Sequence, residues 1–269
     1  MALLAVLIVA SLSGAGVYVW RRASVQPASG QGAALPSPTA TTSSPEPPPP
    51  SPEPTPSAVL HPTPSIGLPT RDLTYGDKGR QVRNLQLLLK GLGYDVPATD
   101  GRFGFDTLHA VVAFQKVHGL SRDGTVGPKT RQALASPVTP KALHPKQRGV
   151  SFEVDLTRQV LYLLHGGRIV RIVDASTGGG YSFVSRGIQK VADTTPGEFH
   201  VYQQFDDWYQ SNVGPMYRSS FYYRGFAIHG SSSVPPYPSS HGCVRVTLSA
   251  IDRLWPEIHL GTPVSVYRT

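Results

Sequence analysis

Residues 240–245 read Ser-His-Gly-Cys-Val-Arg, and this stretch holds the only cysteine of the 269 residues. A lone cysteine cannot form an intramolecular disulfide, so its neighbours decide its role. Val244 and Val246 alternate with Cys243 and Arg245, which predicts a strand with the valines toward the core and Cys243, Arg245 and His241 on the other face. Imidazole, glycine and guanidinium are surroundings that favour a thiolate. The stretch therefore points to acyl transfer through a thioester.

A second histidine, His229, ends the apolar run Phe-Ala-Ile at residues 226–228. We expect it at a sheet edge or at the mouth of a cleft. A nucleophilic cysteine needs a nearby base that takes its proton and later returns a proton to the leaving amine. Gly242 allows close approach of the backbone, so the N–H groups of Gly242 and Cys243 are candidates for binding an oxyanion.

Three other readings stay open when the residues are considered alone. Cys243 could be an inert buried thiol, as free cysteines often are. His229, His241 and Cys243 are all legitimate zinc ligands, although no carboxylate lies near them in the sequence to support such a site. Arg245 could be an ordinary solvated charge.

The composition is basic, with 25 Lys and Arg against 17 Asp and Glu, a formal net charge of +8 and a pI near 9.7. Such a charge suits nucleic acid, an anionic membrane face or an anionic cell wall. No block of Lys and Arg with interleaved aromatic residues and no nucleic-acid-binding motif is present. We therefore expect no nucleic-acid partner.

The N-terminus predicts a transmembrane or signal-anchor segment at residues 1–22. Residues 2–19 are almost wholly apolar or small, which is just long enough to span a bilayer core, and a buried core helix is the alternative. Arg21 and Arg22 follow the run, which opposes export by the positive-inside rule. Either a basic segment precedes the printed start or the anchor inserts against this bias. No cysteine lies near residue 20, which excludes a lipoprotein anchor.

Residues 23–71 are rich in proline and are predicted to be a linker without a core, in an extended polyproline conformation. Such a linker would be a semi-rigid spacer that lifts the following domains off a membrane. A disordered tail is the alternative.

Residues 72–136 are predicted to be a small helical domain. Val82, Leu85 and Leu89 recur at helical spacing, a second amphipathic stretch covers 108–115, and Pro128 suits the first position of a third helix. The motif Asp-Gly-x-x-Gly occurs at 100–104 and again at 123–127. Each copy predicts a tight turn that leads into a helix, so we interpret the repeat as a structural feature before a functional one.

Residues 137–149 carry three prolines and are predicted to be a second linker, and residues 150–269 read as β-rich. Gly166 and Gly167 predict a two-residue hairpin, and one short helix is expected at 249–255. The runs that predict strands are 152–156, 160–165, 168–173, 199–202 and 264–267. About 120 residues suffice for an ordinary single-domain core.

Two family resemblances follow from these motifs. The ordered matches from Gly76-Asp77 through both Asp-Gly turns to Thr130 resemble a peptidoglycan-binding-like three-helix domain. That resemblance implies docking onto cell-wall glycan or peptide, or a domain that only spaces or orients the catalytic unit. From Val154 to Val264, the segments Ser-Thr-Gly at 176–178, Ala-Ile-His-Gly at 227–230 and residues 240–245 are similar to the L,D-transpeptidase (YkuD-type) catalytic domain. The fold expected is therefore an all-α domain followed by a mainly-β domain.

The second resemblance also implies roles for site residues. Cys243 would be the nucleophile and His229 the general acid/base, with the Gly230 carbonyl orienting His229. His241 would line the site, and the Gly242 and Cys243 amides would bind the oxyanion. Arg245 would hold the substrate or the loop, although some family members carry asparagine there. Ser240 belongs to the same substrate-binding set, and Tyr237 either walls the pocket or simply packs.

The activity implied is a transferase that forms 3→3 cross-links between peptidoglycan stem peptides. L,D-carboxypeptidase activity and attachment of a wall protein are alternatives on the same site. A zinc peptidase and a non-catalytic wall-binding protein are alternatives of other classes. We expect no cofactor and no metal, stem peptides and glycan as partners, a membrane contact through the N-terminal segment, and an extracytoplasmic location, either anchored or secreted.

Overall fold

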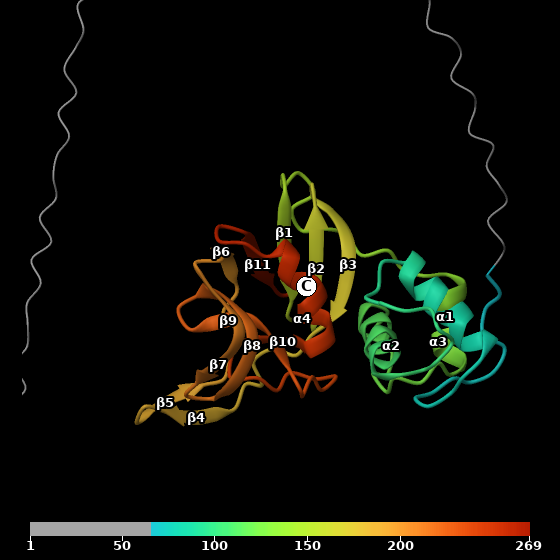
Figure 1. Ribbon diagram of the computed structural model, residues 1–269, viewed down its shortest axis with the longest axis horizontal. Coiled ribbons are helices and arrows are strands. Elements are labelled where there is room, and N and C mark those ends of the chain that lie inside the picture. The colour runs from blue at the N-terminus through green and yellow to red at the C-terminus, as the bar shows by residue number, and fades with distance from the viewer. Residues whose placement is uncertain (1–65) are drawn as a thin grey trace, which may run out of the picture. The chain divides into compact units, whose positions relative to one another are not determined.

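The computed structural model describes residues 66–269, all of which belong to the same unit of the chain. Its first part contains three helices, α1 (Arg80–Gly91), α2 (Phe105–Val117) and α3 (Pro128–Ala135), shown in Figure 1. Val82, Leu85 and Leu89 of α1 are completely buried, which confirms the helical spacing read from the sequence. Pro128 lies in the first turn of α3, as expected. We call this part, residues 66–136, the helical region.

Two buried glutamines hold the repeated Asp-Gly turns. Each side chain accepts a hydrogen bond from the glycine N–H and donates to the aspartate and to a threonine of the following helix. The two sets are Gln86 with Gly101, Asp100 and Thr107, and Gln115 with Gly124, Asp123 and Thr130. Both glycines have positive φ, 75° and 71°, where side chains other than hydrogen are disfavoured. The repeat is therefore the structural device that the sequence predicted.

The second part is mainly β, and its first sheet has the strand order β3-β2-β1-β11-β6. Strand β1 pairs in parallel with β11, and the other neighbours are antiparallel. The turn between β2 and β3 is made by Gly166 and Gly167, both with positive φ, which confirms the predicted hairpin. The bounds are β1 Val150–Asp155, β2 Val160–His165, β3 Arg168–Asp174, β6 Gly197–His200 and β11 Pro263–Tyr267.

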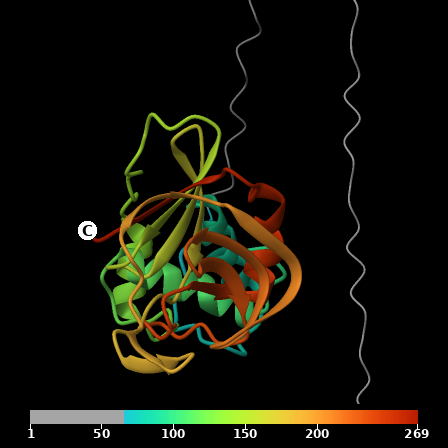
Figure 2. The ribbon, with the colours of Figure 1, turned by 90° about the vertical axis from the view of Figure 1, so that its left-hand side faces the viewer.

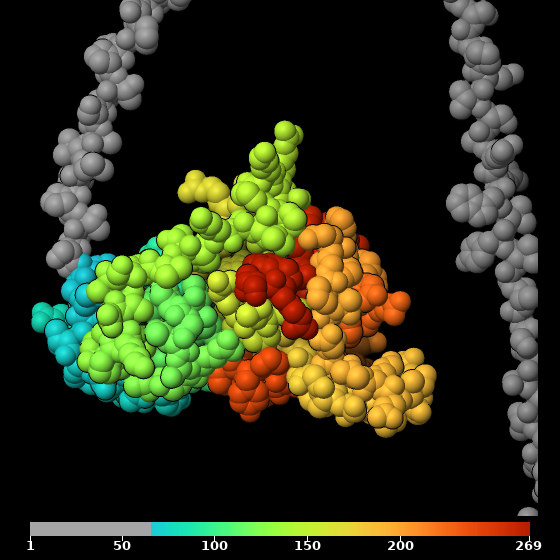
Figure 3. Space-filling view, turned by 180° about the vertical axis from the view of Figure 1, so that it is seen from behind, coloured from blue at the N-terminus to red at the C-terminus, as the bar shows by residue number. Residues whose placement is uncertain are grey.

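The second sheet has the order β10-β9-β8-β7, and its β9 and β10 run parallel. Buried side chains of both sheets and of helix α4 (Leu248–Leu254) form one core, and the short 3₁₀ helix η1 (Trp255–Glu257) follows α4. A separate hairpin, β4–β5, projects from the rest of the β part (Figures 2 and 3). The remaining bounds are β4 Ser182–Ser185, β5 Ile188–Val191, β7 Gln203–Ser211, β8 Gly214–Tyr223, β9 Phe226–Ser231 and β10 Val244–Thr247.

The helical region and the first sheet share a core. Helix α2 packs beside β3 (Figure 1). Phe114 and Val117 of α2 belong to the same buried cluster as Val160, Tyr162 and Ile172 of the sheet. The backbone of the helical region also reaches the sheet edge, because Ile172 exchanges hydrogen bonds with Gly93 and Asp95. The two parts are thus joined by apolar packing and by main-chain bonds.

The expected fold class, a three-helix domain followed by a mainly-β domain, is the fold observed. Three hairpins, β4–β5, β7–β8 and β8–β9, were not predicted. Most residues of β4, β5 and β7 are exposed or half-exposed, so these strands lack the apolar alternation that marks a half-buried strand.

The predicted transmembrane segment at 1–22 and most of the predicted linker at 23–71 lie outside the described residues. Within residues 66–269, no helix has the length and apolarity that a membrane crossing requires.

Candidate active site

Cys243 immediately precedes β10 and is buried with a free thiol. Val244 and Val246 lie in the core between the sheets, whereas Cys243 and Arg245 face a cavity on the opposite side. The predicted alternation of faces is therefore confirmed. The strand itself begins at Val244, because residues 241–243 form a bend.

The bend depends on Gly242, whose φ is 128°. A Cβ at this position would lie 2.4 Å from a ring carbon of Phe226 and 3.0 Å from the Asp193 carbonyl oxygen. The Gly242 carbonyl accepts a hydrogen bond from the Thr194 hydroxyl at 2.8 Å, and the same hydroxyl accepts from the Gly178 N–H. Close packing and these bonds fix the approach of the backbone to Cys243.

His229 lies on β9, next to β10, where its register partner is Arg245. It is 3% exposed, and its Nδ1 is 2.9 Å from the Gly230 carbonyl oxygen. A carbonyl can only accept, so Nδ1 carries the hydrogen of the neutral ring and Nε2 is left as the basic nitrogen. Burial lowers the pKa of His229 from its usual 6.5 to about 4, against the effect of the Gly230 bond and aided by the charge of Arg245. The imidazole is therefore neutral at pH 7.

A small cavity of about 20 Å³ brings the predicted residues together. Its lining includes Cys243, His229, His241, Arg245 and Ser240. Thus five of the residues singled out from the sequence meet at one point, although they come from two strands and a bend.

The thiol of Cys243 is in an apolar setting. The thiol donates to the Gly225 carbonyl oxygen at 3.8 Å and to the Met216 sulfur at 3.9 Å, and the backbone at Ala227 bonds to it as well. Burial raises the pKa of Cys243, and the backbone at Ala227 and the charge of Arg245 offset only part of this effect. The expectation of surroundings that favour a thiolate is therefore wrong for this state. The site holds a neutral thiol beside a neutral imidazole, because desolvation outweighs the nearby cation.

A much wider cavity, of about 570 Å³, adjoins the small one and shares Cys243 and His241 with its lining. His241 and Cys243 contribute to its lining, the side chains of Phe183, Phe221 and Phe226 are apolar walls, and the β4–β5 hairpin supplies one rim. Its cations are Arg186, Lys190 and Arg224. The cavity can therefore take an extended, anionic ligand that reaches the thiol.

His241 lines both cavities, and its ring makes edge contacts with Tyr181 and Phe183 at centroid distances of 5.5 Å and 4.6 Å. Burial and the charge of Arg245 lower its pKa. Its Nδ1 is buried and has no hydrogen-bond partner among residues 66–269. The hairpin thus packs on the histidine next to the cysteine.

Three of the predicted site residues make contacts within the protein that bear on their expected roles. The Gly242 N–H donates to the Ser240 hydroxyl at 3.0 Å, so it is not free to bind an oxyanion in this structure. Ser240 is fully buried, and its hydroxyl donates to the Cys243 carbonyl at 2.6 Å, so it pins the bend. The Tyr237 side chain is 61% exposed and lines neither cavity. Its loop turns this side chain outward, and only its carbonyl is used, as the acceptor for the Ser176 hydroxyl.

Arg245 is held through its backbone. Its N–H and its carbonyl both bond to Ser176, each at 2.9 Å. Its side chain lines the small cavity, where its charge lowers the pKa values of His229, His241 and Cys243. An ordinary solvated charge does not fit this placement.

Sequence reasoning missed the residues of the wide cavity. Arg186 and Gly187 both have positive φ and turn the chain between β4 and β5, and a glycine between two apolar pairs was a usable hairpin signal. Lys190 lies on β5 of the same hairpin, so the same signal would have placed it there. Arg224 has positive φ and, with Gly225, forms the two-residue turn between β8 and β9, which was a second usable hairpin signal, whereas no local signal marks Met216.

Within residues 66–269, no group of three or more His, Cys, Asp or Glu is arranged to hold a metal ion.

Comparisons with known proteins divide along the two parts of the chain. A sequence model of a putative peptidoglycan binding domain matches residues 78–134, and the model of the L,D-transpeptidase catalytic domain matches residues 149–266. The solved structure of an L,D-transpeptidase from Xylanimonas cellulosilytica is 41% identical, with a TM-score of 0.70. The match covers 73% of this chain and 98% of that one, so it includes both the helical region and the β part.

Curated relatives match the chain over shorter stretches. A probable N-acetylmuramoyl-L-alanine amidase from Bacillus licheniformis is 41% identical over 66 residues, which cover 24% of this chain and 19% of that protein. The N-acetylmuramoyl-L-alanine amidase CwlM from Mycobacterium tuberculosis is 35% identical over 108 residues, which cover 39% and 24%. The chain thus spans less than a quarter of the length of each of these two relatives.

Proposed function

This chain belongs to the L,D-transpeptidase family, and on that premise we propose that it is a peptidoglycan transpeptidase with Cys243 as nucleophile and His229 as general acid/base. The observation that carries the assignment is the bond of His229 Nδ1 to the Gly230 carbonyl, 2.9 Å long, in a cavity shared with the chain's lone thiol. It leaves Nε2 of a neutral imidazole as the proton acceptor on the cavity side.

The first half of the reaction is acylation. The sulfur of Cys243 attacks the carbonyl between the third stem residue, a diamino acid, and D-alanine, while His229 Nε2 takes the thiol proton. His229 then gives this proton to the departing amine, so the C–N bond breaks, free D-alanine leaves and a thioester remains. Because burial raises the pKa of the Cys243 thiol and lowers that of His229, we expect the proton to move as the sulfur attacks rather than before it. Since the Gly242 N–H is already engaged, the Cys243 N–H is the oxyanion donor of the pair.

The second half transfers the acyl group. The side-chain amine of another stem attacks the thioester, His229 accepts a proton from this amine and the thiol is regenerated, which gives a 3→3 cross-link. Water in place of the amine gives L,D-carboxypeptidase activity, and an amine of a wall protein gives protein attachment. Each of the three acceptors uses the same acyl-enzyme.

The wide cavity is the proposed entry for the donor stem, because the small one of about 20 Å³ has no room for it. Arg186, Lys190 and Arg224 along this cavity would meet the carboxylates of the stem. The net charge of +8 suits the same anionic polymer. Action on the cell wall requires an extracytoplasmic location, and a periplasmic-type reporter fused after residue 60 tests it: reporter activity only in the cytoplasm would contradict export.

The decisive experiment is intact-mass spectrometry of the full chain mixed with a tetrapeptide stem. We expect a covalent adduct equal to the donor minus D-alanine, and a cross-linked dimer of stems as the accumulating product. Cys243→Ala should give neither, and His229→Gln should form the adduct about 100-fold or more slowly, in keeping with the loss of a general base. His165→Gln, at an exposed histidine outside both cavities, is the matched control. Normal turnover by Cys243→Ala would overturn the assignment.

A further inference from the structure

A completely buried lysine joins the helical region to the β part. Lys116 is on α2, and none of its side chain is exposed. Its ammonium group donates to Asp174 Oδ1 at 2.5 Å, to the Ala175 carbonyl at 2.8 Å and to the Gln159 carbonyl at 3.0 Å. An ammonium group has three donors, so its hydrogen-bonding capacity is fully used. A charge this deeply buried is tolerated only where a counter-charge and hydrogen bonds compensate for its lost hydration.

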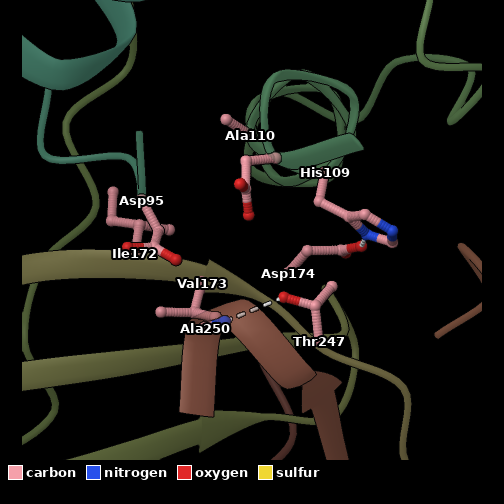
Figure 4. Close-up of a pocket in the computed structure, with 9 residues that line it drawn as sticks. Asp95, His109, Ala110, Ile172, Val173, Asp174, Thr247 and Ala250 are labelled. Atoms are coloured by element: carbon pink, nitrogen blue, oxygen red, sulfur yellow. Dashed lines mark hydrogen bonds and ion pairs between the residues drawn. The ribbon is translucent and has the colours of Figure 1, made fainter. Parts of the chain in front are cut away.

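The partner carboxylate is held from the same helix. Asp174 ends β3 with 1% of its side chain exposed, and its other oxygen lies 2.6 Å from Nδ1 of His109 on α2. Figure 4 shows His109 and Asp174 facing each other between α2 and the sheet. Both oxygens of this carboxylate are therefore bound by side chains of the helical region.

The residues that follow Asp174 hold the stretch around Cys243. Ser176 exchanges two main-chain bonds with Arg245, each 2.9 Å long. The Thr177 carbonyl accepts from the N–H groups of Ser239 and Ser240, each at 2.8 Å. Cys243 thus lies between two attachments, one before it and one after it, and both are made by residues 174–177. We call these residues the support segment.

Gln159 gives a second route from Lys116 to the same segment. Its side chain bonds twice to Thr177, through the Thr177 N–H at 2.8 Å and the Thr177 hydroxyl at 2.6 Å. Its backbone has φ of 62°, a conformation disfavoured for a residue with a side chain, and its carbonyl is the one that Lys116 binds. Lys116 therefore holds the support segment directly at Asp174 and Ala175 and indirectly through Gln159.

The loop before Cys243 is also tied to the helical region. Arg122, which follows α2, donates to the Pro236 carbonyl at 3.1 Å and to the Thr157 carbonyl at 3.3 Å. Arg122 and Pro236 also line one cavity together with His109 of α2 and with Asp174. The helical region therefore contacts the β part at the elements that carry the cysteine.

We propose that Lys116 is a positioning residue for Cys243, and that the helical region is a built-in support of the active site in addition to any wall-binding role. By fixing the support segment, Lys116 sets where the Cys243 bend and β10 lie relative to His229 on β9. This inference rests on the proposed role of Cys243. It adds an orienting role for the helical region, one of the two roles that the sequence left open, without excluding the other.

The test compares three variants of the full chain. Lys116→Met keeps the length of the side chain and removes all three bonds. Lys116→Met/Asp174→Asn also removes the carboxylate charge that the first change leaves unpaired. Lys129→Met changes an exposed lysine of α3 and is the matched control. For each variant we would measure kcat and KM with a tetrapeptide stem, the melting temperature, and hydrogen–deuterium exchange of residues 174–177 and 239–245.

For Lys116→Met we expect kcat to fall about 10- to 100-fold with KM changed less than about twofold, as for a displacement of catalytic groups on the order of 1 Å. Exchange should become faster in both segments, and the melting temperature should fall. The double variant should regain melting temperature while kcat stays low and exchange stays fast, because its neutral pair restores charge balance without restoring the bonds to Gln159 and Ala175. Lys129→Met should behave as the wild type.

A folded single or double variant with wild-type kcat and unchanged exchange would overturn the positioning role. Failure of both to fold would also overturn it, since Lys116 would then be a folding residue. The test separates this inference from the proposed function. Normal turnover by Cys243→Ser would sink the proposed function, whereas the exchange data would still report whether Lys116 holds residues 239–245.

Discussion

Replacing Gly242 with alanine displaces the bend that carries Cys243, and the structure sets the size of the effect. The new Cβ would lie 2.4 Å from a ring carbon of Phe226 and 3.0 Å from the Asp193 carbonyl oxygen. Ordinary carbon–carbon contacts are about 3.5–4.0 Å, so the bend or the ring must move by about 1 Å. The φ of 128° adds backbone strain, because only glycine adopts it freely.

Two magnitudes follow for Gly242→Ala. A misplacement of about 1 Å at the reacting group costs roughly 100-fold in turnover, equivalent to about 2.7 kcal/mol in the activation barrier. The strained backbone costs about 1–3 kcal/mol of folding free energy. At about 2–4 °C per kcal/mol for a chain of this size, the melting temperature should fall by several degrees while the protein stays folded at 25 °C.

The assay is the initial rate of stem turnover, with thiol titration of the unfolded protein to verify that Cys243 is intact. Gly91→Ala is the control, because no atom lies within 4 Å of its added Cβ and its φ is not positive. Adding Phe226→Leu to Gly242→Ala separates the two causes: partial recovery assigns the loss to the ring contact, and no recovery assigns it to the backbone. A Gly242→Ala enzyme with more than half of the wild-type rate would refute the idea that this bend positions the thiol.

Three further predictions concern charge. Burial lowers the pKa of His229 from 6.5 to about 4, so the folded state resists protonation of this ring. Up to about 3 kcal/mol of folding free energy should therefore be present above pH 6.5 and be lost as the pH falls from 6.5 to 4. Melting temperatures measured across this pH range should show the loss, and His229→Gln should reduce it. Arg245→Gln should raise the pKa of Cys243 and slow its alkylation by iodoacetamide at pH 8, whereas faster alkylation would contradict the role given to this charge. Lys190→Gln and Arg224→Gln should each raise KM up to about fivefold at low salt with kcat unchanged, because these cations are exposed and are screened at high salt; a KM that is insensitive to both changes would remove them from donor binding.

Most of the fold could be predicted from patterns within short stretches of the sequence. The spacing of Val82, Leu85 and Leu89 gave α1, and the Gly166-Gly167 turn gave β2–β3, because each depends on residues close together in the chain. The alternation of Val244 and Val246 with Cys243 placed the thiol on the correct face. His229 was found because it ends the apolar run at 226–228, but it lies inside β9, an inner strand of its sheet, and not at the sheet edge that the run suggested.

What sequence could not give depends on contacts between distant segments. The wide cavity lies between the β4–β5 hairpin and the strands β7, β8 and β9. No local pattern in the sequence shows that this hairpin lies beside those strands. Ser240 and the Gly242 N–H were assigned to the substrate, yet they bond to each other, because a bend turns both inward. Lys116 looked like an ordinary helix residue, and only the packing of α2 against β3 shows that it is buried with three partners.

The state of the thiol also depended on tertiary structure, and it bears on how the enzyme would survive in an oxidising compartment. Oxidants and alkylators attack the thiolate, so a cysteine whose pKa is raised by burial is protected while no substrate is bound. The same burial makes the resting thiol a weak nucleophile, which is why the proposed mechanism couples deprotonation to attack, with His229 as the acceptor. The charge of Arg245 lowers the pKa of Cys243, which favours the thiolate. It also lowers the pKa of His229, which disfavours the imidazolium. The alkylation rate of the wild type measures this balance: a rate at pH 8 near that of free cysteine would mean that the thiol ionises without substrate, and the coupled mechanism would fail.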